Sequence, residues 1–193
     1  MSSDVAARTP RSPSASAALL RTLLDSSFKN WRGMSQSGGR RIKRAVYIDV
    51  STIRLCDDDM LQRFESFQLI RDYVRARRAE VEDYNREHGV DPQRLINGRR
   101  LTNVGTFRAY VEAYLRSHPR VHQDMTLLIR QLDPGPTGLP LEIYAFANDT
   151  RWEPYEAIQA DIFDHILAVA PQFDLRVFQE PTGKDFEKLS RPA

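Results

Sequence analysis

Apolar residues recur along the chain with two different spacings, and these spacings predict the order of its secondary structure. From Ile42 to Val50 the β-branched aliphatic residues share one parity, whereas Ile53 and Leu55 share the other. Side chains in a strand alternate between its two faces, so a change of parity indicates a bulge or a bend. We therefore predict one long strand from about Ile42 to Leu55, bent near residues 51–52.

Apolar residues at helical spacing next predict a helix from about Asp59 to His88, ended by Gly89 and Pro92. The acidic run Asp57-Asp58-Asp59 stands where a helix N-terminus favours a side-chain cap and negative charge. The run could also bind a cation, but no second carboxylate cluster follows it at the spacing of a calcium loop. We interpret it as a cap.

The stretch from Gly89 to Gly105 shows no clean period, and we interpret it as a family-specific insertion. Thr106 is then the predicted N-cap of a second helix that ends before Pro119. The apolar stripe of this helix consists of Phe107, Tyr110, Val111 and Tyr114.

A hairpin follows, because residues 125–129 and 139–145 both alternate and a Pro/Gly-rich loop, residues 133–138, separates them. Thr150 and Glu153 have the spacing of a capping box for a helix that extends to Pro171. A last strand is expected from Leu175 to Gln179. This order predicts an α+β fold, a ferredoxin-like split βαβ (βαββαβ) with a helical insertion in the first crossover.

The N-terminal part differs in composition from the rest. Residues 1–22 are rich in Ser, Ala, Pro and Arg without sustained periodicity, which is typical of disorder. Residues 23–39 read as the last strand of a neighbouring unit followed by a Gly/Ser joint. We thus expect a disordered segment 1–22, a remnant and joint 23–39, an α/β domain 40–183 and a tail 184–193.

Composition narrows the class of protein. The 193 residues are 41% hydrophobic and 28% charged with a formal net charge of +2, an ordinary soluble profile. The sequence holds no run of about 20 apolar residues and no signal peptide, so we expect a cytosolic chain. Its single cysteine, Cys56, forms no internal disulfide and excludes a Cys-rich zinc module.

Catalytic chemistry finds little support. His118 and His122 are four residues apart, but Pro119 breaks the helix that would align them for a metal. Asp161 and His165 share a helical face without a recognisable nucleophile or metal partner. Glycine motifs that cradle phosphate are missing from the sequence. We expect no metal, no cofactor and no enzymatic activity.

Four basic residues in five positions, Arg40, Arg41, Lys43 and Arg44, form the one true local charge cluster. Such a cluster attracts lipid headgroups, nucleic acid or anionic solutes, or it only keeps the start of a strand soluble. Aromatic interleaving typical of a single-strand binding platform is absent around it. Nucleic acid is therefore a minor alternative.

Several blocks resemble the cytoplasmic region of the small-conductance mechanosensitive channel family, most closely its miniconductance branch. The resemblance covers about Leu24 to Gly183. The matching blocks are residues 27–34 (SFKNWRGM), 37–44 (SGGRRIKR), 103–110 (NVGTFRAY), 124–127 (DMTL), 138–146 (GLPLEIYAF) and 158–166 (IQADIFDHI).

This resemblance implies a homo-oligomer, typically a heptamer, in the bacterial inner membrane that bilayer tension opens during osmotic downshock. Family members have membrane helices, a small Sm-like β-domain and a C-terminal α/β domain that forms a vestibule below the pore. By resemblance, residues 28–33 are the last strand of that β-domain, with Asn30 and Trp31 where the family closes it. The basic cluster would follow the junction between the domains, near side portals that admit solutes.

The leading hypothesis is thus a vestibule domain of such a channel, as a fragment or truncated product that lacks the membrane-spanning pore. As part of a channel, the domain would lie on the cytoplasmic face of the inner membrane and contact the membrane only through missing or partner helices. If the chain is complete, we expect it in the cytoplasm. The alternative is a free-standing ferredoxin-like module that binds anionic ligands or nucleic acid through the basic cluster.

Overall fold

The computed structural model describes residues 38–180. The chain divides into two units between Gly38 and Gly39, and the elements below belong to the second unit. They follow in the order β1 (Arg40–Ile48), the 3-10 helix η1 (Val50–Thr52), α2 (Asp58–Glu65), α3 (Arg71–Glu87), α4 (Asn103–Ser117), β2 (Leu128–Gln131), β3 (Leu139–Ala147), α5 (Trp152–Val169) and the 3-10 helix η2 (Ala170–Phe173). The predicted strand 28–33, the segment 1–22 and the tail 184–193 lie outside the described residues.

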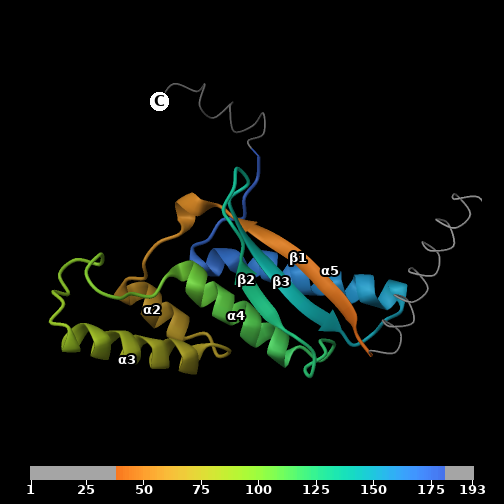
Figure 1. The fold of residues 1–193 in the computed structure, drawn as a ribbon, viewed down its shortest axis with the longest axis horizontal. Helices are drawn as coiled ribbons and strands as arrows, with labels where there is room; N and C mark the ends of the chain where they lie inside the picture. Colours follow the sequence, from red (N-terminus) through yellow and green to blue (C-terminus); the bar gives the residue numbers. More distant parts are fainter. Residues whose placement is uncertain (1–37, 181–193) are drawn as a thin grey trace, which may run out of the picture. The chain divides into compact units, whose positions relative to one another are not determined.

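The three strands form an antiparallel sheet in the order β1-β3-β2. Strand β1 pairs with β3 from Arg40 opposite Ala147 to Ile48 opposite Leu139. Helices α4 and α5 lie behind the sheet in Figure 1 and cover one of its faces, so the described unit has a helix layer on a sheet layer. The prediction of an α+β fold with a β2–β3 hairpin is confirmed.

The prediction of a last strand at residues 175–179 is wrong. Residues 175–179 do not form a strand; Val177 makes a single antiparallel bridge to Ile48, and Phe178 N donates to the carbonyl of Tyr47 at 2.8 Å. The described sheet therefore has three strands rather than four.

The hydrophobic core lies between the sheet and helices α4 and α5. The predicted alternation in β3 is confirmed, because every second residue from Leu139 to Ala147 is buried. Helix α5 contributes Tyr155, Ile158, Ile162 and Ile166 from one face, as its apolar spacing predicts. At the end of the sheet towards α2, Phe173 lies in a cluster of aromatic rings that consists of Phe64, Phe67, Phe107 and Tyr110.

The predicted long strand 42–55 ends earlier than expected. The parity change does mark a bend, but the bend is the 3-10 helix Val50–Thr52, whose N-cap Asp49 accepts hydrogen bonds from the Ser51 backbone at 2.9 Å and its hydroxyl at 2.6 Å. This side-chain cap satisfies the backbone locally and removes it from the sheet ladder. Leu55 instead makes an isolated bridge to Thr102.

The predicted single helix 59–88 is two helices. Helix α2 ends at Glu65, and α3 begins at Arg71. Between them the chain turns, and in this turn the ring of Phe67 packs against Phe64 and Phe173. Two signals of that prediction are confirmed: Asp57 caps α2 by accepting from Met60 N at 2.9 Å, and Gly89 follows the last turn of α3 with a φ of 60°.

Two predicted N-caps are wrong. Helix α4 begins at Asn103 with Thr102 as its cap, and Thr106 is buried one turn inside the helix, where its hydroxyl donates to the Thr102 carbonyl at 3.0 Å. Helix α5 begins at Trp152 after Arg151, which makes no side-chain cap, so Thr150 and Glu153 form no capping box.

Residues between α3 and α4 are held by side-chain contacts. The Asn85 amide donates to the Arg99 carbonyl at 2.9 Å, and its oxygen accepts from Arg99 N at 2.8 Å. Cys56 N donates to the carbonyl of Leu101 at 2.9 Å. The insertion predicted from residues 89–105 is thus tied to α3 and to the segment before α2.

Candidate functional site

The predicted site residues fall into two groups. Asn30 and Trp31 lie outside the described residues. Arg40, Arg41, Lys43 and Arg44 all lie in β1, an edge strand of the described sheet. Because side chains alternate along a strand, the sheet divides this basic cluster between its two faces.

Arg40 and Arg44 point to the face that carries α5. The Arg40 guanidinium lies 4.2 Å from the ring centroid of Tyr155 and 4.7 Å from that of Trp152, and Arg44 lies 4.4 Å from the ring of Phe163. Guanidinium groups over aromatic faces gain electrostatic and stacking energy. These two residues therefore fasten the start of β1 to α5.

The same junction contains a hydrogen bond from α5 to the strand. The Tyr155 hydroxyl donates to the Arg41 carbonyl at 2.9 Å, and burial raises the pKa of this hydroxyl. The bond satisfies a carbonyl at the edge of the sheet. It lies directly after the boundary between the two units, so it holds the entry of the chain into the second unit.

Arg41 and Lys43 point to the opposite face, which no described helix covers. There, Glu142 of the central strand β3 is only 7% exposed and lies between two cations: Arg130 Nε at 2.8 Å and Lys43 Nζ at 3.8 Å. We call Lys43, Glu142 and Arg130 the cross-strand triad. The sequence analysis missed it, although a Glu in the middle of an apolar strand was the available signal.

The histidines meet different partners from those that their spacing suggested. His165 accepts or donates at 3.0 Å to the Tyr110 hydroxyl and stacks on Tyr114 with ring centroids 4.0 Å apart. Asp161 lies 3.3 Å from the His118 ring nitrogen, and its charge also acts on His165. Burial lowers the pKa of His165, which favours its neutral form between α4 and α5. Within residues 38–180, no three His, Cys, Asp or Glu side chains gather as metal ligands would.

Asn103 is a buried polar residue that the sequence analysis did not single out by itself. Its amide nitrogen donates to the carbonyls of Thr52 at 2.9 Å and Phe173 at 3.2 Å. Its oxygen accepts from Arg54 N at 3.0 Å and Val104 N at 2.9 Å. Four bonds from one side chain join the bend after β1, the start of α4 and η2, which is a structural role.

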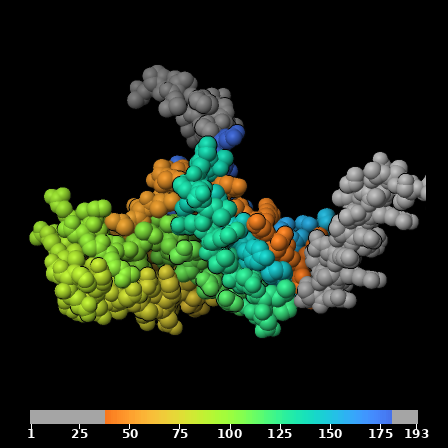
Figure 2. All heavy atoms as spheres, viewed as in Figure 1, coloured from red at the N-terminus to blue at the C-terminus, as the bar shows by residue number. Residues whose placement is uncertain are grey.

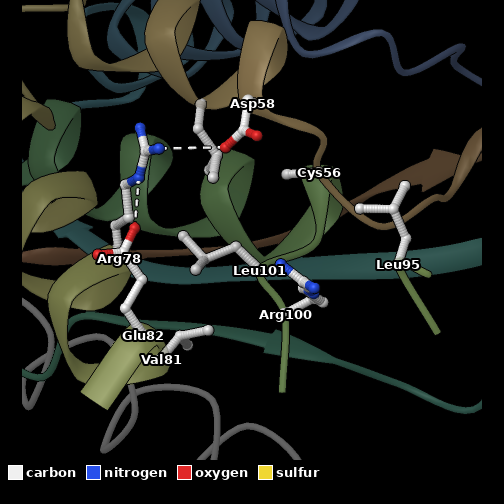
Figure 3. Close-up of a pocket in the computed structure, with 9 residues that line it drawn as sticks. Cys56, Asp58, Arg78, Val81, Glu82, Leu95, Arg100 and Leu101 are labelled. Carbon is white, nitrogen blue, oxygen red and sulfur yellow. Dashed lines mark hydrogen bonds and ion pairs between the residues drawn. The ribbon is translucent and has the colours of Figure 1, made fainter. Parts of the chain in front are cut away.

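A small cavity of about 50 Å³ lies between α2, α3 and the residues before α4 (Figure 3). Arg78 is already engaged there by Asp58 at 3.1 Å, Glu82 at 2.9 Å and Glu65 at 3.5 Å. Cys56 borders the cavity, and burial raises its pKa to about 11, so its thiol stays protonated and unreactive at neutral pH. A space of this size holds water rather than a substrate.

The described candidate site thus consists of cations stacked on α5 and of the cross-strand triad on the opposite face of the sheet. No helix among the described residues combines the length and the apolar character needed to cross a bilayer. Residues 108–177 match the family model of the C-terminal domain of the mechanosensitive ion channel MscS. The match runs from Arg108, within α4, through β2, β3 and α5 to the bridge residue Val177.

Proposed function

We propose, on the premise that this chain carries a C-terminal MscS-family region, that it serves as the cytoplasmic vestibule domain of a mechanosensitive ion channel that responds to osmotic downshock. The observation that carries the proposal is the family match over residues 108–177, which includes the whole β2–β3 hairpin and α5. In this proposal the conducting pore belongs to membrane-spanning segments other than the described residues, and the channel lies in the bacterial inner membrane. The domain needs a rigid sheet and charged surfaces but no catalytic group.

The proposal includes a homo-oligomer, as C-terminal domains of this family form oligomers in channels, and a heptamer as the specific assembly. It also includes a ferredoxin-like order, in which residues 175–179 occupy the place of the fourth strand beside β1 without forming a strand themselves. The sheet order β1-β3-β2 and the bridge between Ile48 and Val177 support that order, since they place the last segment beside β1.

We propose that the basic cluster supplies positive charge at the side portals through which solutes enter. We also propose that Asn30 and Trp31 close a neighbouring β-domain. Support comes from position: β1 begins at Arg40, directly after the unit boundary. Arg41 and Lys43 are exposed and free of α5, so they are the members that passing ions would meet. The free-standing anion-binding module is less favoured, because two of the four cations are stacked on α5 and no single cationic patch results.

A chimaera tests the channel function. Residues 24–183 of this chain would replace the corresponding region of a full-length channel of the family in bacteria that lack their own mechanosensitive channels. We expect survival of osmotic downshock and tension-gated currents in patch recordings. A control chimaera with Ile162→Asp in the core should lose both, whereas Ala79→Asp on the exposed side of α3 should not. A chimaera that assembles in the membrane at normal levels but never opens would refute the proposal.

The portal role has a separate readout. In the same chimaera, Arg41→Gln with Lys43→Gln should shift the reversal potential in a salt gradient towards greater preference for cations, because two positive charges leave the ion path. The matched control is Arg108→Gln, an exposed charge on α4. An unchanged reversal potential in the double variant would remove these residues from the ion path.

A further inference from the structure

A hollow of about 290 Å³ lies where the turn between α2 and α3 meets α4 and the end of α5. The turn contributes residues 67–69, helix α4 contributes Tyr110, and the end of α5 with η2 contributes Val169, Gln172 and Phe173. Strands β1, β3 and β2, which face the viewer in Figure 2, contribute no residue to it. We call this space the aromatic hollow. An occupant would leave the basic cluster and the cross-strand triad uncovered.

Three aromatic rings line the deeper part of the hollow. Phe173 is fully buried, and its ring centroid lies 5.4 Å from that of Phe67 and 5.3 Å from that of Tyr110. The interplanar angles are 68° and 54°, so the rings present both edges and faces. A further aromatic ring can extend such a tilted cluster favourably. Val169 is half-buried and Leu69 is exposed at the rim, and both add apolar surface.

The lining is already fixed in the free chain. In the turn, Phe67 N donates to the Phe64 carbonyl at 3.1 Å, and the Phe67 carbonyl accepts from Ile70 N at 3.1 Å. The Tyr110 hydroxyl is held by the ring nitrogen Nε2 of His165 at 3.0 Å. A ligand therefore meets a preformed space and does not have to order these side chains.

The polar groups around the hollow are neutral. None of the described residues that line it is Asp, Glu, Lys or Arg, and the amides of Gln68 and Gln172 stand at its exposed rim. With a neutral His165, one hydrogen of the Tyr110–His165 pair is used between them in either tautomer, so the Tyr110 hydroxyl can make one more hydrogen bond. A charged ligand would lose hydration here without meeting an opposite charge.

We propose that the aromatic hollow binds a small neutral aromatic molecule of one or two rings that carries a hydrogen-bonding group at its outer end. The size agrees, because an apolar cavity of about 150 Å³ holds one benzene ring and this hollow has about 290 Å³. Aromatic walls with a few polar groups at the mouth are typical of ligand sites. The inference goes beyond the proposed function and does not depend on it.

The dimensions favour a small molecule over a helix of a partner protein. A helix with its side chains is about 10–12 Å across, whereas a sphere of the same volume as the hollow has a diameter of about 8 Å. A partner could therefore insert no more than a side chain. Residues 67–69 also precede the family match, which begins at residue 108, so the match does not assign this site.

Titration calorimetry on the full chain tests the site with indole as the probe. Indole is neutral, has two fused rings and carries one N–H donor. We expect a dissociation constant of about 1 mM or tighter, which is ordinary for a ligand of about nine non-hydrogen atoms. Indole-3-acetate has the same rings with a carboxylate. It should bind at least about tenfold more weakly, because no cation lines the hollow.

Substitutions in the lining locate the bound probe. Val169→Trp places a large side chain in the hollow and should weaken indole binding by at least about tenfold. Leu69→Ala removes apolar surface at the rim and should weaken it by about threefold. The matched control is Leu167→Ala, because Leu167 is 42% exposed against 44% for Leu69 but does not line the hollow. This control should bind indole as the native chain does.

Circular dichroism establishes that each variant is folded. If Val169→Trp does not fold, the comparison of Leu69→Ala with Leu167→Ala decides alone. The site is refuted if the native chain binds no indole up to about 5 mM, if the folded lining variants bind it normally, or if indole-3-acetate binds as tightly as indole. If the native chain binds no indole and Leu69→Ala instead weakens self-association in the ultracentrifuge, the hollow holds a side chain of another copy and the small-molecule site is wrong.

Discussion

Asn103 offers the sharpest test of how the second unit is held together. Its side chain is fully buried and makes four hydrogen bonds to the backbones of Thr52, Arg54, Val104 and Phe173. Replacement by Ala leaves two donors and two acceptors without this partner. The bonds to Val104 and Phe173 are buried, so water does not replace them, whereas the other two are partly accessible.

The expected cost follows from these environments. A buried polar group left unpaired costs about 1–3 kcal/mol, and a hydrogen bond that water can replace contributes about 0.5–1.5 kcal/mol. For two buried and two accessible groups these ranges total about 3–9 kcal/mol, so we expect Asn103→Ala to lower the free energy of unfolding by at least about 3 kcal/mol, a large part of the 5–15 kcal/mol typical of a domain. Urea denaturation followed by circular dichroism measures this loss.

Asn103→Asp adds a test by pH. An Asp carboxylate retains the acceptor but faces two carbonyl oxygens in a buried site, so its pKa in the folded chain should rise. A raised folded pKa means that the variant is relatively most stable at low pH and loses stability as the pH rises through that pKa. Its deficit relative to the native chain should therefore be smaller at about pH 4 than at about pH 8.

Asn148→Ala is the matched control. The Asn148 amide makes one hydrogen bond, to the Pro119 carbonyl at 3.0 Å, on the surface. This substitution should cost no more than about 1 kcal/mol. If Asn103→Ala costs as little as Asn148→Ala, the role of Asn103 as the joint of three segments is refuted.

Three further predictions concern backbone strain, acid stability and thiol reactivity. Gly138→Ala should lower the melting temperature strongly, because φ is +90° and a Cβ would clash with a β1 carbonyl. Gly89→Ala should lower the free energy of unfolding by only about 1 kcal/mol, because φ is +60° but a Cβ there would meet open space. Hydrogen bonds from Ser51, then Arg176, lower the pKa of Asp49 to about 2, so its carboxylate stabilises the fold above about pH 4 and this contribution disappears as the pH falls towards 2. Asp49→Asn should be less stable than the native chain at pH 7, with the difference vanishing near pH 2. Cys56 should react with a thiol reagent at about pH 8 only after denaturant is added, since its pKa is raised to about 11.

Each of these three predictions would be contradicted by a specific measurement. Equal melting temperatures for the two glycine variants would remove the close approach at Gly138. A constant difference between Asp49→Asn and the native chain over the acid range would show that this carboxylate titrates alike in the folded and unfolded states. Rapid labelling of the native thiol would place Cys56 at the surface.

Local patterns were sufficient for the elements whose signals lie within a few residues. The alternation of β3, the apolar stripe of α5 and the Asp57 cap depend on neighbours in sequence, and all three predictions are confirmed. Alternation along β1 also indicates that the basic cluster divides between two faces, because Arg40 and Arg44 are an even number of residues from the buried Ile42. The family resemblance to the C-terminal region is confirmed over residues 108–177.

Tertiary structure decided whatever depends on residues far apart in sequence. Phe67 packs on Phe173 from the turn that divides the predicted helix into α2 and α3. Asn103 forms hydrogen bonds with Thr52 and Phe173. Glu142 forms ion pairs with side chains of both neighbouring strands. His118 at the end of α4 contacts Asp161 of α5. These contacts join segments far apart in sequence, because hydrophobic spacing shows which side chains are buried but not which distant residues they meet.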